Sequence, residues 1–136
     1  MPMQTMTATS RKEDFKAKFD SASEDYEYFL HEYSVARRTA FFRSKSQGLC
    51  LEVGAGAGNI LEKLGLPQRA MGINLSFKMV REIKSKGFFC CQADGEYLPI
   101  QNDTLDTVIG SEMVCCLDEP ERFLRLLLSS FNNSVR

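Results

Sequence analysis

Three glycines, each separated from the next by one residue, are the strongest chemical signal in this chain. Gly54, Gly56 and Gly58 follow the apolar run Leu-Cys-Leu-Glu-Val and precede helix-forming residues, which predicts an abrupt turn from a strand into a helix. Glycine permits positive φ and lets a ligand lie against the backbone, and a helix N-terminus offers free amides. A plain tight turn would need only one glycine. We therefore interpret this stretch as a ligand-binding turn.

The spacing of the glycines indicates which ligand the turn suits. A dinucleotide-binding turn is written G-x-G-x-x-G, and its third glycine would fall at Asn59. This chain has G-x-G-x-G instead, with Glu52 two positions upstream. The pattern resembles motif I of the class I S-adenosylmethionine (SAM) dependent methyltransferases. A nicotinamide-dependent oxidoreductase is disfavoured, both by this spacing and by an amide at Asn74 where a ribose-binding acid would be expected.

Further segments resemble the same family and follow in its order. They are 71–76, similar to the second strand; 92–100, similar to the adenine loop; 103–110, similar to the fourth strand with its leading acid at Asp106; and 118–124, similar to the helix that follows in the ubiquinone/menaquinone-biosynthesis (type 11) branch. The resemblance covers residues 49–126, and the chain is identified as a member of that branch. For Asp106 we favour a purely structural role, a hydrogen bond to neighbouring backbone.

The resemblance implies where the methionine part of SAM would lie. Its neighbours would be the backbone atoms of the glycine turn, namely Gly54, Ala55, Gly56 and Gly58. Glu52 would orient this loop or hold the ammonium group of the ligand. Ser111, just after the fourth strand, would approach the methyl group. No residue is singled out as catalytic, because methyl transfer from a sulfonium needs mainly alignment.

The adenosine part would lie against the second and third strands. In the family an acid holds both ribose hydroxyls, and here Asn74 takes that position. Leu75 would pack on the adenine face, and Asp94 would accept a hydrogen bond from the adenine amino group. The backbone of Gly95 or Glu96 would face the ring edge, although Glu96 is equally compatible with a solvated loop charge. Since an amide offers one acceptor oxygen and a carboxylate two, we expect Asn74→Asp to tighten SAM binding.

Other reactive side chains give no sign of a second chemistry. The chain has five cysteines: Cys50 stands alone, and Cys90 with Cys91 and Cys115 with Cys116 form two adjacent pairs. This arrangement lacks the C-x2-4-C spacing of zinc sites, so we expect structural thiols and no metal. The single histidine, His31, is interpreted as an exposed helix residue. No Asn-Pro-Pro-Tyr or Pro-Cys motif follows the fourth strand, which favours a small-molecule acceptor over a nucleic acid.

The elements that must position these residues alternate between strands and helices. Strands are predicted at 49–53, 69–73, 88–91 and 105–110, with helices at 59–64, from Ser76 to Gly87, and after Asp118. Apolar residues at helical spacing predict helices over 13–45, interrupted near Ser21 and Ser23. The fold class is therefore α/β, a Rossmann-like parallel sheet of about four strands with an N-terminal helical segment. The expected organisation is a flexible arm (1–12), a helical cap (13–47), a SAM-binding core (48–131) and a tail (132–136).

Composition excludes several classes of protein. The 136 residues carry 17 Lys+Arg against 18 Asp+Glu, a balance that lacks the basic character of a nucleic-acid binder. No apolar run approaches the roughly 20 residues that span a bilayer, and the first residues lack a secretory signal. We expect a cytoplasmic protein.

The chain is short for the family it resembles, whose sheet has seven strands. A further βα unit takes roughly 30 residues, more than the chain that follows Gly110. We therefore expect a C-terminally truncated domain whose fourth strand is an open edge, and hence a homodimer or a partner chain at that edge. The alternative to an active methyltransferase is a non-catalytic SAM-binding subunit that a partner chain completes.

Overall fold

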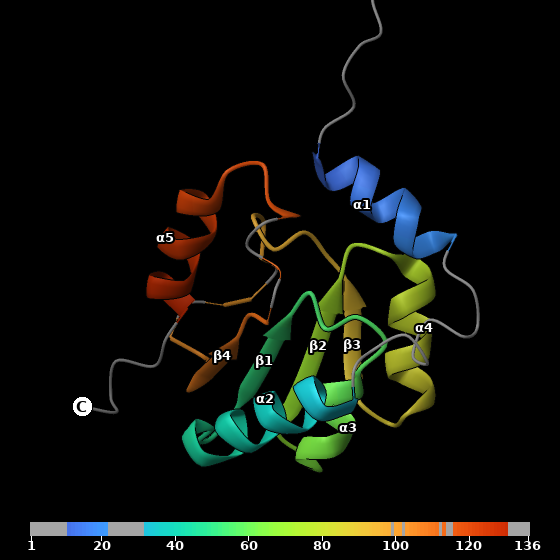
Figure 1. The fold of residues 1–136 in the computed structure, drawn as a ribbon. Coiled ribbons are helices and arrows are strands. Elements are labelled where there is room, and N and C mark those ends of the chain that lie inside the picture. Colours follow the sequence, from blue (N-terminus) through green and yellow to red (C-terminus); the bar gives the residue numbers. More distant parts are fainter. Residues whose placement is uncertain are drawn as a thin grey trace, which may run out of the picture.

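The computed structural model describes residues 11–21, 32–98, 100–101, 103–111, 113 and 116–130. Its strands form one parallel sheet and are β1 (Cys50–Val53), β2 (Ala70–Asn74), β3 (Phe89–Gln92) and β4 (Thr107–Ile109). Its helices are α1 (Arg11–Asp20), α2 (Glu32–Lys45), α3 (Asn59–Leu64), α4 (Phe77–Ser85) and α5 (Pro120–Ser130). Figure 1 shows the sheet between these helices. The α/β fold with a Rossmann-like parallel sheet of four strands, predicted from the sequence, is confirmed.

The strand order determines where a ligand can bind. Across the sheet the order is β3-β2-β1-β4, so the chain runs outward from β1 to β3 and then returns to the other side of β1. Right-handed crossovers place α3 and α4 on one face, and α5 covers the other (Figure 1). Ligands of open α/β sheets bind outside the carboxyl ends of the strands, where the order reverses. In this chain that point lies between β1 and β4.

Strand β1 is buried on both faces and organises the core. Leu51 packs in one cluster with Phe123 of α5, while Cys50 packs in another with Leu61 of α3. Because side chains alternate along a strand, Glu52 points to the same side as Cys50. A carboxylate is thereby carried into the covered side of the sheet, and Glu52 is only 2% exposed.

Two predicted local contacts are confirmed. Ser76 precedes α4 as its N-cap, and its Oγ accepts a hydrogen bond from the Met79 amide at 3.4 Å. Asp106 has the structural role that we favoured, since its Oδ2 accepts from the Leu49 amide at 2.8 Å. This bond joins the entrance of β4 to that of β1.

In the N-terminal region, residues 11–20 and 32–45 are helical, as the spacing of its apolar residues predicts. Helix α2 packs on α3, and α1 contacts α4 (Figure 1). Helix α1 begins at Arg11, two residues before the expected start, and ends next to Ser21. The predictions for residues 1–10, Ser23, His31, Cys115 and the tail lie outside the described residues. In the described part of the chain, no helix has the length and apolarity required to cross a bilayer.

Candidate functional site

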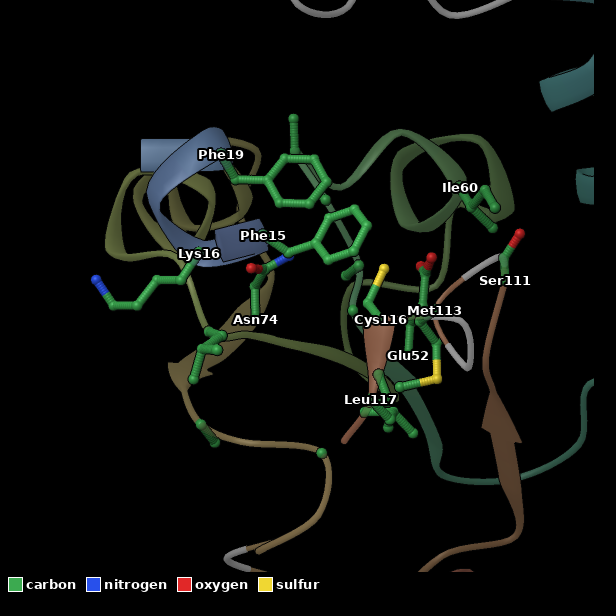
Figure 2. Close-up of a pocket in the computed structure, with 18 of the residues that line it drawn as sticks. Phe15, Lys16, Phe19, Glu52, Ile60, Asn74, Ser111, Met113, Cys116 and Leu117 are labelled. Carbon is green, nitrogen blue, oxygen red and sulfur yellow. The ribbon is translucent and has the colours of Figure 1, made fainter. Parts of the chain in front are cut away.

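A cavity of about 500 Å³ opens at the carboxyl ends of the strands, at the reversal point of the sheet. Its floor is the turn after β1, its walls come from the segments after β2, β3 and β4, and α2 closes one side. Helix α1 forms the roof, and the rings of Phe15 and Phe19 reach from it toward the cavity (Figure 2). These two rings stack on each other with centroids 6.4 Å apart.

The glycine turn gives the cavity a floor of bare backbone. All three glycines have positive φ, 67° at Gly54, 56° at Gly56 and 85° at Gly58. A Cβ on Gly56 would meet no atom within 4 Å, whereas one on Gly54 would approach Met113 Cβ to 2.9 Å. Gly54 and Gly56 line the cavity. Gly58 instead lies against Ile83 of α4, so it permits close packing of α3 on α4.

Glu52 places a buried carboxyl group at this floor. It lines the cavity, and its Oε2 has no hydrogen-bond partner among the described residues. Burial raises the pKa of Glu52 to about 8, and the nearby positive charge of Arg38 opposes this shift. A buried carboxylate without a partner is costly, so this group favours a cationic or proton-donating ligand beside it.

Arg38 of α2 lines the cavity on the same side and was not anticipated from the sequence. Its Nη1 donates to Ser111 Oγ at 3.0 Å, and its Nε and Nη2 donate to the backbone oxygen and Oγ of Ser34 at 3.3 and 3.1 Å. These bonds fix the guanidinium between α2 and the segment after β4. Glu52 and Arg38 thus place a carboxyl group and a guanidinium at one end of the cavity.

The end of β2 supplies the opposite wall, with Asn74 and Leu75 lining the cavity. Asn74 is 8% exposed, and its Oδ1 accepts from the Ser76 amide at 2.9 Å. The amide oxygen is therefore engaged within the turn. Ser76 Oγ also donates to Asp20 Oδ1 of α1 at 2.6 Å, which ties one end of the roof to this wall.

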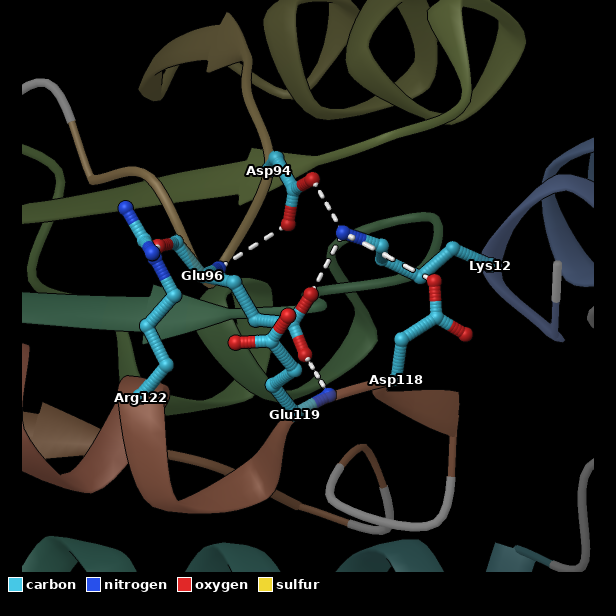
Figure 3. Close-up of polar contacts among 6 residues, drawn as sticks. All are labelled: Lys12, Asp94, Glu96, Asp118, Glu119 and Arg122. Carbon is cyan, nitrogen blue, oxygen red and sulfur yellow. Dashed lines mark hydrogen bonds and ion pairs between the residues drawn. The ribbon is translucent and has the colours of Figure 1, made fainter.

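The loop after β3 carries a cluster of charges (Figure 3). Asp94 lines the cavity, and its Oδ1 accepts from the Glu96 amide at 2.9 Å. Its Oδ2 accepts from Lys12 Nζ of α1 at 2.7 Å. Glu96 is 1% exposed and is not part of the cavity lining; its carboxylate accepts from the Glu119 amide and forms an ion pair with Lys12. Glu96 thereby links the loop to the start of α5.

Lys12 is the second charged residue that the sequence did not reveal, since it fell in the predicted arm. Besides Asp94 and Glu96, its Nζ lies 3.9 Å from Asp118 Oδ2. Partial burial lowers the pKa of Lys12, but hydrogen bonds to Asp94 and Glu96 outweigh this effect and raise it above the usual value. Lys12 therefore stays protonated and joins α1 to the loop after β3.

The structure brings together most of the residues singled out from the sequence. Those lining the cavity are Glu52, Gly54, Ala55, Gly56, Asn74, Leu75, Asp94, Gly95 and Ser111. Gly58 and Glu96 lie just behind the lining. Among the described residues no group of His, Cys, Asp or Glu side chains is arranged to hold a metal ion. The helical spacing of Phe15 and Phe19 predicted the helix that forms the roof. Nothing in that spacing indicated that the two rings face a cavity.

Comparison with known families gives one match that covers most of the sheet and α5. The model of a family described as a methyltransferase domain matches residues 51–128. Among proteins of curated function, none is similar enough in sequence to count as a relative.

Several solved structures share the fold. A SAM-dependent methyltransferase of Thermotoga maritima, possibly a histamine N-methyltransferase, is 23% identical, with a TM-score of 0.59 over 78% of this chain and 55% of its own. The magnesium protoporphyrin IX methyltransferase of Synechocystis PCC 6803, solved with bound SAM, is 18% identical, with a TM-score of 0.73 over 94% of this chain and 75% of its own. A putative methyltransferase solved with a Haloferax volcanii methyltransferase activator is 18% identical, with a TM-score of 0.68 over 90% of this chain and 56% of its own. This chain spans about half the length of the first and third of these proteins.

Proposed function

The chain belongs to the methyltransferase domain family, and from that premise we propose that it binds SAM in the cavity and transfers the methyl group to a small-molecule acceptor. The observation that carries the proposal is the buried Glu52 carboxyl at the bare glycine floor. Its Oε2 has no partner among the described residues, and the ammonium group of a bound amino acid would supply one. The open space in front of Gly56 fits the close approach of such a ligand to the backbone.

Arg38 completes the recognition of the methionine end. An amino acid carries a carboxylate beside its ammonium group, and the cavity presents Arg38 beside Glu52. A guanidinium suits a carboxylate because its N–H groups form a planar fork. We assign the ammonium group to Glu52 and the carboxylate to Arg38, with Ser111 held by Arg38 near the methyl group.

The adenosine end would lie along the segments after β2 and β3. Leu75 and Gly95 line the cavity here, so Leu75 would pack on the adenine ring and the backbone of Gly95 would border the ring edge. Asp94 would accept from the amino group. Because Asn74 Oδ1 already accepts from Ser76, we assign the Asn74 amide N–H groups as donors to a ribose hydroxyl.

The reaction asks little of the protein beyond alignment. SAM supplies an activated methyl group on its sulfonium, and holding an acceptor in line with it provides most of the rate enhancement. In this chain the alignment would come from the glycine floor below, from Arg38 and Ser111 at one end, and from α1 above. The half-buried rings of Phe15 and Phe19 exclude water on the roof side, and their apolar character favours a small organic acceptor.

We also propose the organisation of the chain and its branch within the family. The SAM-binding core would be 48–131, and the helical cap, expected at 13–47, would extend back to the start of α1 at Arg11, because α1 and α2 close the cavity that the core opens. The segment 118–124 supports placement in the ubiquinone/menaquinone-type branch. Strand β4 pairs with β1 and ends the sheet in the described part of the chain, which supports a homodimer or a partner chain at that edge.

The test is thermal stabilisation by S-adenosylhomocysteine. A ligand that binds only the folded state, supplied at about 100 times its Kd, adds about 2.7 kcal/mol, or about 10 °C in Tm for a domain of this size. The matched variants are Gly56→Ala and Gly65→Ala. Both glycines have positive φ, 56° and 67°, and a Cβ on either meets no atom within 4 Å, so the two substitutions carry the same backbone strain.

We expect Gly56→Ala to lose the ligand-induced shift and Gly65→Ala to keep it, because only Gly56 lines the cavity. A wild-type protein that shows no shift at millimolar ligand refutes the proposed function. Transfer of labelled methyl from SAM, with and without cell extract, then decides between an enzyme and a non-catalytic SAM-binding subunit. Displacement of the ligand by NAD would instead indicate an oxidoreductase.

A further inference from the structure

Helix α1 is attached to the rest of the molecule in an unusual way, by polar contacts near each end. Near its start, Lys12 Nζ bonds to Asp94 at 2.7 Å and forms an ion pair with Glu96. At its last residue, Asp20 Oδ1 accepts from Ser76 Oγ at 2.6 Å. Between these contacts, Phe15 and Phe19 face the cavity and are only half-buried. The helix therefore spans the cavity and gains little from close packing there.

Asp94 is engaged by the protein itself at both carboxylate oxygens. Its Oδ1 accepts from the Glu96 amide at 2.9 Å, which shapes the loop. Its Oδ2, the oxygen left for the cavity, accepts from Lys12. A ligand group that donates to Asp94 must therefore share Oδ2 with the ammonium group of Lys12 or displace that group.

The position of Lys12 makes displacement feasible. Its Nζ also forms an ion pair with Glu96 and lies 3.9 Å from Asp118, so it has other carboxylates within reach when it leaves Asp94. It lies 5.4 Å from the centre of the Tyr97 ring as well. Its side chain is 17% exposed and that of Asp94 22%, so water has access to this ion pair.

We propose that Lys12 is a latch that closes α1 over the cavity by occupying Asp94, and that the amino group of a bound adenine releases it. The proposal rests on the proposed function for the identity of the ligand, but the latch itself is a property of the ligand-free protein. Lys12 and the adenine amino group then compete for one oxygen. Binding at Asp94 loosens the start of α1, while the bond between Ser76 and Asp20 keeps the rest of the helix over the cavity.

The decisive variant is Lys12→Gln, with Lys18→Gln as the matched control. Both lysines lie in α1 and both substitutions remove one positive charge, but Lys18 is exposed and does not line the cavity. Lys12→Gln removes the partly exposed ion pair between Lys12 and Asp94, which competes with the ligand for Asp94. The substitution should therefore tighten S-adenosylhomocysteine binding by about threefold to tenfold. Lys18→Gln should bind like the wild type. S-inosylhomocysteine carries a carbonyl oxygen in place of the amino group and has no donor at that position, so it should gain nothing from Lys12→Gln.

Two further measurements test the latch. Hydrogen exchange of the α1 amides without ligand should be faster in Lys12→Gln than in Lys18→Gln, because one end of the helix is released. Raising the salt concentration weakens a partly exposed ion pair, so the affinity of the wild type for S-adenosylhomocysteine should rise with salt. This comparison of the wild type with itself requires no variant to fold.

The outcomes separate the latch from the proposed function. If the wild type binds S-adenosylhomocysteine but Lys12→Gln binds it equally or more weakly, the latch is refuted and the function stands. Equal exchange of α1 in Lys12→Gln and Lys18→Gln refutes the latch whatever the ligand. If no protein binds S-adenosylhomocysteine, the proposed function fails, and the exchange rates alone decide whether Lys12 holds α1.

Discussion

Replacing Glu52 by Gln should remove the fall in stability that ionisation of this buried carboxyl group causes as pH rises from mildly acidic to neutral. Burial raises the pKa of Glu52 from 4.5 to about 8. Between these two values the folded protein keeps a proton that the unfolded chain has lost. Stability falls with pH wherever the folded state binds more protons, so ionisation of Glu52 destabilises the fold throughout this interval.

The size of the effect follows from the shifted pKa. Each pH unit inside the interval costs about 1.4 kcal/mol. With a folded pKa of about 8, the free energy of unfolding should fall by about 2–3 kcal/mol between about pH 5.5 and about pH 7.5 because of Glu52 alone. A glutamine side chain at this position would fill the same space without a titrating proton. The variant should therefore lack this component at every pH in the range.

The assay is urea unfolding of both proteins at several pH values without ligand. The decisive quantity is the difference between wild type and Glu52→Gln, because the single histidine and the other acids are present in both proteins and cancel. A difference that stays constant with pH, within about 0.5 kcal/mol, would refute the burial argument. A constant offset at all pH values would report only the packing of the glutamine side chain, so the slope is the test.

Three more predictions concern the ligand and the sheet edge. Asn74→Asp should tighten S-adenosylhomocysteine binding by about 1.5–3 kcal/mol, measured by calorimetry, because one oxygen can accept from Ser76 while the other accepts from the ribose; unchanged affinity contradicts the ribose assignment. Arg38→Met should weaken S-adenosylhomocysteine by about tenfold or more and leave methylthioadenosine unaffected, since the latter has no carboxylate; equal losses for both would indicate a collapsed cavity. Light scattering coupled to chromatography should show a dimer or larger species, and a monodisperse monomer at high concentration would contradict the open edge at β4.

Much of the fold could be predicted because its signals are local. The bounds of α3 follow from the glycines on either side of it, and Ser76 caps α4 through a bond that spans only three residues. The short apolar runs identified the strands, and their alternation with helices required a parallel sheet. Strand β4 is shorter than predicted: its ladder with β1 begins at Thr107, and Asp106 meets the Leu49 amide through its side chain.

The site was predicted less completely than the fold. Residues on the turns after the strands could be found, because parallel strands bring their carboxyl ends to one edge. Gly58 and Glu96 belong to the same turns but do not line the cavity, because Gly58 packs against Ile83 and the Glu96 carboxylate accepts from the Glu119 amide. A motif fixes which residues are near one another, and the direction of each side chain depends on neighbours that are distant in sequence.

The sequence by itself determined the sheet, the bare glycine floor and the acid beside it, because each depends on backbone preferences within a few residues. Only the tertiary structure decided what closes the cavity. Lys12 reaches Asp94 across 82 positions of the chain, and Arg38 reaches Ser111 across 73. Helical periodicity gives the face of α1 or α2 that is apolar, but not the part of the molecule on which that face comes to lie. That choice is made by packing and by charge pairs between segments that are far apart in the sequence.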